Sequence, residues 1–232
     1  MTSQAVADAI IVGAGHSQRM DGIDKVFAPL GGRPLLCHSV EVFEASPLIK
    51  RIIVALSQDN LDHGRELAAA RGWHKARLCV GGERRQDSVR AGLDCLDGAE
   101  WIVVHDAARP MLTADLIERG LQAAQRSGAA VCAVPIADTV KLIGAYDTII
   151  ETLPRERLRA VQTPQVFRYS LLMAAHRATA TTATDDAAMV EALGHHVVIY
   201  EGSMENIKVT TPVDLSFAEA ILQRRATLTR TD

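Results

Sequence analysis

Neither sign of charge dominates this chain of 232 residues, in which 25 Lys and Arg side chains stand against 28 Asp and Glu side chains. A net charge of −3 provides no broad positive field of the kind that attracts nucleic acids or anionic membranes, so neither partner is expected. Any cations that bind phosphate must therefore be concentrated locally.

Cysteine is scarce, and no C-x-x-C pair indicates a metal or redox site. We expect the four cysteines to be small core residues, three of them within apolar helical or extended runs: Cys37, Cys79, Cys95 and Cys132. Unpaired cysteines fit a reducing compartment, and Met1–Val6 is too short for a targeting peptide. On these two grounds we expect a cytoplasmic protein. No uncharged apolar run reaches the ~18 residues of a membrane-spanning helix.

Short extended runs alternate with segments of helical spacing along the chain. Apolar residues at successive positions, as in 9–12 and 102–104, are typical of strands buried on both faces of a parallel sheet. The sequence therefore predicts one α/β domain over residues 1–232, with helices packed on a mostly parallel sheet. The predicted strands are Ala9–Val12, Arg51–Leu56, Arg77–Val80, Trp101–His105, Ala129–Val134 and His196–Glu201.

Two segments depart from this alternation. Asp138–Ile143 and Thr148–Leu153 predict a β-hairpin, which we take as a projecting arm over residues 137–158. Near the C-terminus, Thr211, Pro212 and Asp214 predict the capped start of a helix that runs to about Gln223.

Glycines and cations follow the first predicted strand. Glycine lets the backbone of Gly13–Gly15 turn tightly and direct N–H groups at an anion, and Arg19 and Lys25 add positive charge. For the glycines alone, a structural turn is the simpler interpretation. The two cations favour a phosphate-binding loop, because a turn gains nothing from them.

Two known phosphate-binding motifs do not fit this loop. A P-loop needs Lys-Ser or Lys-Thr after its last glycine, and the loop has neither. The dinucleotide fingerprint begins with Gly13 and Gly15 but has Gln18 where its third glycine belongs. A nicotinamide-dependent oxidoreductase is thus the weaker alternative.

A carboxylate ends the strand that leads into residues 105–110. Asp106 lies where open α/β sheets bind ligands, and it could meet a magnesium ion or a ribose hydroxyl. A turn or cap aspartate is the plain alternative. His105 has no second histidine at metal-ligand spacing, so we expect a hydrogen-bonded structural histidine.

Residues 81–89 form a second glycine-containing segment after a strand. The Gly81-Gly82 pair would let the backbone approach a flat base, and the Ser88 hydroxyl could bind its polar edge. Lys208, just before the capped helix, lies on the rigid support that a catalytic cation needs.

Taken together, these motifs resemble the 2-C-methyl-D-erythritol 4-phosphate cytidylyltransferase family over roughly residues 7–223. The likeness rests on an ordered set: AGHSQRM with Lys25, GGERRQDSV, HDAARP, DTVK, TPQVF, TDDA and NIKVT. The phosphate-binding loop departs from the family pattern, because Ser17 replaces a usual glycine.

The resemblance implies a Rossmann-like fold, Mg²⁺ held mainly by the triphosphate of CTP, and a homodimer whose arms complete each other's sites. It implies catalytic roles for Arg19, Lys25 and Lys208, and nucleotide contacts from Ala14, Gly15, Gly82, Ser88, Asp106 and Ala107. Methylerythritol phosphate would be bound by Asp106, Arg109, Thr163 and Lys208, with Thr139 and Arg155 from the partner. Asp106 is also the candidate metal ligand.

Two further alternatives remain at this point. A cytidylyltransferase acting on ribitol 5-phosphate shares the chemistry and much of the motif order. A catalytically silent nucleotide-binding protein shares the fold, although it has no physical need for Arg19, Lys25, Asp106 and Lys208 together.

Overall fold

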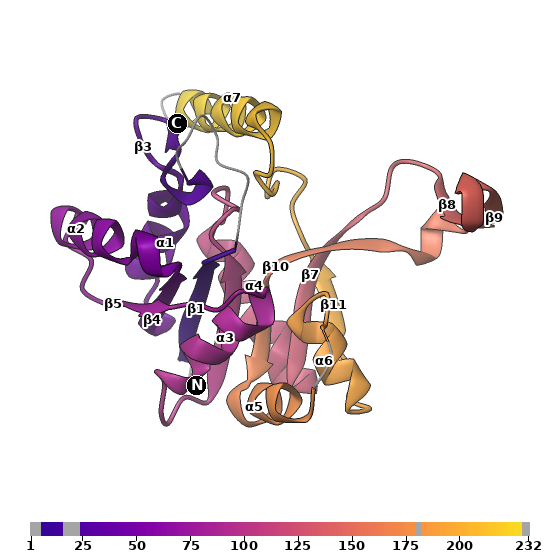
Figure 1. The fold of residues 1–232 in the computed structure, drawn as a ribbon, viewed down its shortest axis with the longest axis horizontal. Coiled ribbons are helices and arrows are strands. Elements are labelled where there is room, and N and C mark those ends of the chain that lie inside the picture. The colour runs from indigo at the N-terminus through magenta and orange to yellow at the C-terminus, as the bar shows by residue number, and fades with distance from the viewer. Residues whose placement is uncertain (1–5, 16–23, 180–181, 229–232) are drawn as a thin grey trace.

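The computed structural model describes residues 6–15, 24–179 and 182–228, and its centre is a seven-stranded sheet (Figure 1). The strand order is β11-β7-β10-β6-β1-β4-β5, and every neighbouring pair is parallel except the two that involve β10. The sheet thus confirms the mostly parallel α/β prediction. Its strands are β1 (Ala7–Gly13), β4 (Ile49–Leu56), β5 (Ala76–Val80), β6 (Trp101–Asp106), β7 (Ala129–Pro135), β10 (Arg159–Arg168) and β11 (Val198–Glu201).

Helices connect the strands and cover both faces of the sheet, as predicted. They are α1 (Leu35–Ala45), α2 (Leu61–Arg71), α3 (Arg85–Asp94), α4 (Ala114–Ser127), α5 (Tyr169–Ala178), α6 (Asp186–Ala192) and α7 (Pro212–Leu228). Short pieces complete the described chain: the pair β2 (Pro29–Leu30) and β3 (Arg33–Pro34), and the 3₁₀ turns η1 (Lys25–Phe27), η2 (Gln58–Asn60), η3 (Ala145–Asp147) and η4 (Arg155–Arg157).

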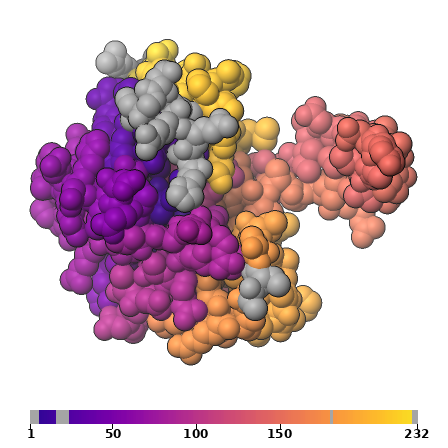
Figure 2. Space-filling model, in the orientation of Figure 1, coloured from indigo at the N-terminus to yellow at the C-terminus, as the bar shows by residue number. Residues whose placement is uncertain are grey.

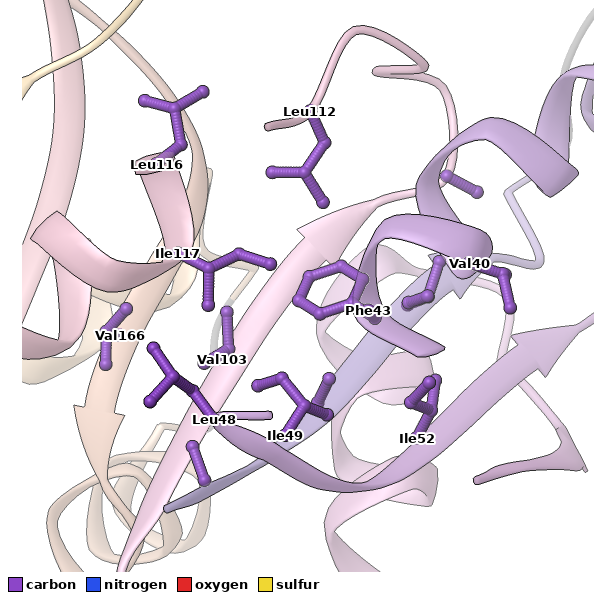
Figure 3. Packing of buried hydrophobic residues seen from close by; sticks show 14 of the residues in the cluster. Val40, Phe43, Leu48, Ile49, Ile52, Val103, Leu112, Leu116, Ile117 and Val166 are labelled. Carbon is purple, nitrogen blue, oxygen red and sulfur yellow. The ribbon is translucent and has the colours of Figure 1, made fainter. Parts of the chain in front are cut away.

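The strands are apolar at successive positions because each side of the sheet carries its own core. Neighbouring residues of β1 point to opposite sides. Ile11 joins the cluster under α1 and α4, whereas Ile10 joins the cluster under α3, α5 and α6. On the first side, Phe43 of α1 packs among β-strand and α4 side chains such as Ile117 (Figure 3).

One strand of the sheet was missed by the sequence prediction. Within β10 lies Pro164, and a proline in a run of residues argues against a central strand. The structure accommodates it at a bulge: Val161 pairs with Ala133 and Gln165 with Val131, so residues 162–164 fall outside the ladder with β7. This bulge lies beside the candidate site.

The projecting hairpin is confirmed. Strands β8 (Val140–Ile143) and β9 (Ile149–Leu153) pair antiparallel and extend well away from the main body (Figures 1 and 2). Apolar side chains on it are exposed, among them Ile143, Tyr146 and Ile150. The use of this arm in dimerisation stays a prediction.

The start of α7 is capped as predicted. The Asp214 carboxylate accepts from the backbone N–H groups of Thr210 and Thr211, both at 2.8 Å, and the Thr211 hydroxyl accepts from the Asp214 N–H. Within the described residues the helix runs to Leu228, beyond the predicted Gln223. It covers a small apolar cluster that includes Leu30 and Val209.

Two findings concern the expectations about cysteine and membranes. All four cysteines are free, and Cys37 and Cys132 are buried, but Cys95 is exposed. The core prediction was wrong for Cys95, which directly follows the end of α3, next to the exposed Asp94. None of the described helices is long and apolar enough to span a membrane.

Truncation of Phe43 tests the core under α1. Phe43 is fully buried, so Phe43→Ala should lower the free energy of unfolding by about 3–5 kcal/mol in chemical denaturation. The matched control is Phe217→Ala on α7, whose side chain is mostly exposed, and it should change the value by less than about 0.5 kcal/mol. Equal losses in both variants would contradict this packing.

Candidate active site

The carboxyl ends of β1 and β6, which are neighbours in the sheet, border a pocket of about 130 Å³. Gly13 at the end of β1 and Gly15 just beyond it form one wall, and Asp106 at the end of β6 and Ala108 just beyond it form another. Lys25, Arg85 and Lys208 bring three cations to the same space. This is the sheet edge at which parallel α/β folds bind ligands.

Asp106 is a buried carboxylate held by two cations. Its Oδ1 accepts from Arg85 Nε at 2.9 Å, and its Oδ2 lies 2.8 Å from Lys208 Nζ. Burial alone would raise the pKa of Asp106, but the charges of Arg85 and Lys208 outweigh it and hold this pKa well below its usual range. Asp106 is therefore ionised at neutral pH.

Lys25 approaches the pocket from η1, whose position is fixed by Asp24. The Asp24 carboxylate accepts from the Val26 N–H at 3.1 Å and from Asn60 Nδ2 at 2.7 Å. Burial, followed by the nearby charge of Lys208, lowers the pKa of Lys25. The structure thus brings Lys25 and Lys208 together, whereas Arg19 lies outside the described residues.

Lys208 lies on the segment between β11 and α7, which is tied to the strand ends on both sides. The Val209 N–H donates to the Ala108 carbonyl at 2.8 Å, and Asn206 Nδ2 donates to the Thr163 carbonyl at 2.8 Å. Arg109 adds a third bond, from its Nη1 to the Asn206 carbonyl at 2.8 Å. These bonds give Lys208 the rigid support that its position in the sequence predicted.

Behind Asp106, Thr163 and His105 form a buried chain of hydrogen bonds. Thr163 Oγ1 accepts from the Asp106 N–H at 3.0 Å and lies 3.0 Å from His105 Nδ1, while His105 Nε2 lies 3.1 Å from the Arg109 carbonyl. Burial lowers the pKa of His105 to about 4. A neutral imidazole that accepts from Thr163 and donates to the Arg109 carbonyl satisfies every contact.

His105 is therefore the structural histidine that the sequence predicted, and its ring also meets Phe43 edge-on at 5.6 Å. The Thr163 hydroxyl is occupied in orienting the backbone of Asp106. Arg109 is partly buried against the Lys208 segment, and burial lowers its pKa. Direct contact of Thr163 or Arg109 with an acceptor molecule stays a prediction.

The glycine pair after β5 is packed against the loop after β1. A Cβ on Gly81 would lie 2.4 Å from the Ala14 Cβ, so only glycine permits this approach. Ser88 is fully buried, and its Oγ accepts from the Gly82 N–H at 3.1 Å. Ala14, Gly82 and Ser88, which were predicted to bind cytosine, thus lie close together. The Ser88 hydroxyl holds the backbone at Gly82.

The structure does not bring every predicted residue into the pocket. Thr139 and Arg155 lie at the exposed base of the arm, where Arg155 Nη1 donates to the Ala137 carbonyl. The arm leads away from the body of its own chain (Figure 2). A contribution of these two residues to a partner's site stays a prediction.

Sequence reasoning missed three residues next to the pocket. None of the three was singled out by the sequence motifs: Arg85 Nη1 donates to Asp186 Oδ2 at 2.6 Å, and Asp186 Oδ1 lies 2.9 Å from His176 Nε2. Asp186 is fully buried. The available signal was the second Asp of TDDA, which follows the N-cap residue Asp185.

A Rossmann-like sheet with a cation-lined pocket at its carboxyl edge defines a nucleotide-binding α/β protein. A family model described as 2-C-methyl-D-erythritol 4-phosphate cytidylyltransferase matches residues 7–224, and the chain belongs to that family. It is therefore an enzyme of the nucleotidyltransferase class.

Individual relatives agree with this assignment. The chain is 46% identical over 217 residues to 2-C-methyl-D-erythritol 4-phosphate cytidylyltransferase of Dehalococcoides mccartyi (strain CBDB1), covering 93% of this chain and 96% of the relative. The crystal structure of 4-diphosphocytidyl-2C-methyl-D-erythritol synthase from Anaerococcus prevotii is similar with a TM-score of 0.84, 28% identity and coverage of 95% and 97%. The crystal structure of 2-C-methyl-D-erythritol 4-phosphate cytidylyltransferase from Thermus thermophilus is similar with a TM-score of 0.76 and 34% identity. This similarity covers 94% of this chain and 99% of that one.

The buried His105 predicts a pH dependence of stability. Its pKa falls from 6.5 to about 4 on folding, so between these pH values the unfolded chain binds more protons. The free energy of unfolding is therefore not reduced by His105 above pH 6.5. It falls as the pH drops from 6.5 toward 4, where the reduction amounts to roughly 3 kcal/mol.

Urea denaturation between about pH 7 and pH 4.5 would measure this effect. His105→Gln should flatten the decline in unfolding free energy relative to the wild type, whereas His195→Gln, at an exposed histidine, should leave the decline unchanged. An unaltered pH slope in His105→Gln would contradict the assignment of a neutral buried imidazole.

Proposed function

We propose that this chain transfers the cytidylyl group of CTP to 2-C-methyl-D-erythritol 4-phosphate, giving 4-diphosphocytidyl-2-C-methyl-D-erythritol and pyrophosphate. The observation that carries the proposal is the meeting of Lys25, Lys208 and Asp106 in one pocket, in a chain of this family. Family membership favours this acceptor over ribitol 5-phosphate. It also argues against the nicotinamide-dependent alternative, whose fingerprint lacks its third glycine.

The reaction brings two polyanions together. An oxygen of the acceptor phosphate attacks the α-phosphorus of CTP in line with the departing pyrophosphate, so the O–P bond to the acceptor forms as the bond to pyrophosphate breaks. The acceptor phosphate is already ionised near neutral pH and needs no general base. The main requirement on the protein is to offset repulsion and the charge that grows on the five-coordinate phosphorus.

Lys25 and Lys208, joined by Arg19, are the side chains proposed for that task. Lys208 is held 2.8 Å from Asp106 but keeps part of its side chain exposed, so it remains available to a phosphate. The loop with Ala14 and Gly15 is proposed to bind the cytosine together with Gly82 and Ser88. Ala107 and Asp106 are proposed to lie at the ribose. Arg109 and Thr163 are proposed on the acceptor side.

Mg²⁺ is proposed as the cofactor. Asp106 is the one carboxylate among the described residues that border the pocket, and the described chain holds no group of three or more metal-ligating side chains. Such a site fits a magnesium ion bound mostly by triphosphate oxygens and water, with Asp106 as a protein ligand. When bound, the ion would neutralise triphosphate charge.

We further propose a cytoplasmic homodimer with shared sites. The exposed apolar side chains of the arm and its extension from the body support an exchange of arms between two chains (Figure 1). Thr139 and Arg155 would then reach the partner's acceptor pocket. The four free cysteines fit a reducing compartment.

The direct test is incubation with CTP and Mg²⁺ and each acceptor in turn, following pyrophosphate release. We expect turnover with methylerythritol phosphate and little with ribitol 5-phosphate, and removal of the metal with EDTA should abolish it. Equal turnover of both acceptors would contradict the proposed specificity.

Loss of either pocket lysine should reduce turnover strongly while the fold stays intact. Lys25→Ala and Lys208→Ala each remove one preorganised charge, for which a fall in kcat on the order of 10²–10³ is expected. Lys50→Ala, at an exposed lysine of β4, is the control and should keep kcat. Near-wild-type kcat in both pocket variants would remove these lysines from the mechanism.

The shared site predicts complementation between two inactive chains. When Arg155→Ala and Lys25→Ala chains are mixed, a heterodimer has one site that carries both defects and one that carries neither. We expect turnover to recover toward half that of the wild-type dimer. Purified heterodimers without recovered turnover would count against a contribution from the partner's arm.

A further inference from the structure

Arg85 connects two buried carboxylates that come from distant parts of the chain. Its Nε donates to Asp106 Oδ1 at 2.9 Å, and its Nη1 donates to Asp186 Oδ2 at 2.6 Å. Asp106 ends β6, and Asp186 opens α6. The side chain of Asp186 is fully buried, and that of Asp106 is 10% exposed.

This arrangement fixes the direction in which Asp106 faces. With Oδ1 occupied by Arg85, the other oxygen, Oδ2, is the one that meets Lys208 Nζ at 2.8 Å. Asp186 is itself held by His176 at 2.9 Å, so the guanidinium rests on a rigid support. A planar guanidinium can serve both carboxylates at once, which the single ammonium of a lysine cannot do in the same geometry.

Stability alone does not account for the bridge. Arg85 Nη2 is buried without a hydrogen-bond partner among the described residues, and an unsatisfied buried donor is costly. Buried ion pairs are also weak contributors to stability compared with apolar packing. Local arrangements that cost stability are typical of functional sites.

We propose that Arg85, anchored by Asp186, is a positioning residue that sets the place of Lys208 through Asp106. Without Arg85, the carboxylate of Asp106 is free to rotate and to hold Lys208 as its sole cation, away from the phosphates. Arg85 thus affects turnover indirectly, through the positions of Asp106 and Lys208. The inference rests on the proposed cytidylyl transfer.

A charge-neutral double variant separates this role from fold stability. Arg85→Gln with Asp186→Asn removes one positive and one negative charge together, so the double variant keeps the net charge of the wild type and leaves no unpaired Asp186. Relative to Asp186→Asn alone, we expect kcat to fall on the order of 10²-fold, because misplaced catalytic groups cost about this much. KM for CTP should change less than threefold, and the melting temperature should stay close to that of Asp186→Asn.

The matched control lies on α2. Arg65 and Asp62 form an exposed ion pair at 2.8 Å, and Arg65→Gln with Asp62→Asn should keep the wild-type kcat. A kcat for the Arg85→Gln, Asp186→Asn chain within threefold of that of Asp186→Asn would overturn the proposal. A wild-type chain that released no pyrophosphate would instead overturn the proposed function.

A second measurement applies even if the double variant fails to fold. Arg85→Lys keeps the charge but loses the bridge, and we expect it to lower kcat about tenfold in the wild-type background. In a Lys208→Ala background the same change should cost less than threefold, because the group that it positions is absent. Equal losses in the two backgrounds would show that Arg85 does not act through Lys208.

Discussion

The site depends on a negative charge that is kept ionised inside a protein built to bind polyanions. Asp106 would be expensive to bury alone, and the cations on either side of it make its ionisation favourable. In return, the carboxylate fixes where those cations stand before any substrate arrives. A preorganised set of charges needs no rearrangement during reaction, which is the main advantage of a protein over water as a solvent for phosphate chemistry.

The arrangement is assembled from segments that are far apart in the sequence. Lys208 is aligned by a backbone bond from its neighbour Val209 to the loop after β6, and Asp106 is aligned by the hydroxyl of Thr163 on β10. Phe43, in the core, packs against the ring of His105, which in turn contacts Thr163. A chain of contacts therefore connects the packing of the core to the orientation of the Asp106 carboxylate.

The sequence was sufficient for features that depend on local pattern. Successive apolar residues predicted the central strands, and Thr211 with Asp214 predicted the start of α7. The sequence did not predict pairing between distant residues. Arg85 and Asp186 are 101 positions apart, and each by itself has the pattern of an ordinary surface charge. Strand β10 was missed because Pro164 contradicts local strand preference, and only the bulge in the folded sheet resolves that conflict.

The bulge in β10 also determines where insertions can be accommodated. The arm leaves the sheet after β7 and returns through β10, so residues added at its tip, between Ile143 and Ile149, lie beyond both strands and leave their alignment intact. A single residue added between Val161 and Gln165 would instead change the shape of the bulge that places the Thr163 hydroxyl at the Asp106 amide. Insertions among relatives should accordingly collect at the hairpin turn and avoid the short segment where the arm rejoins the body.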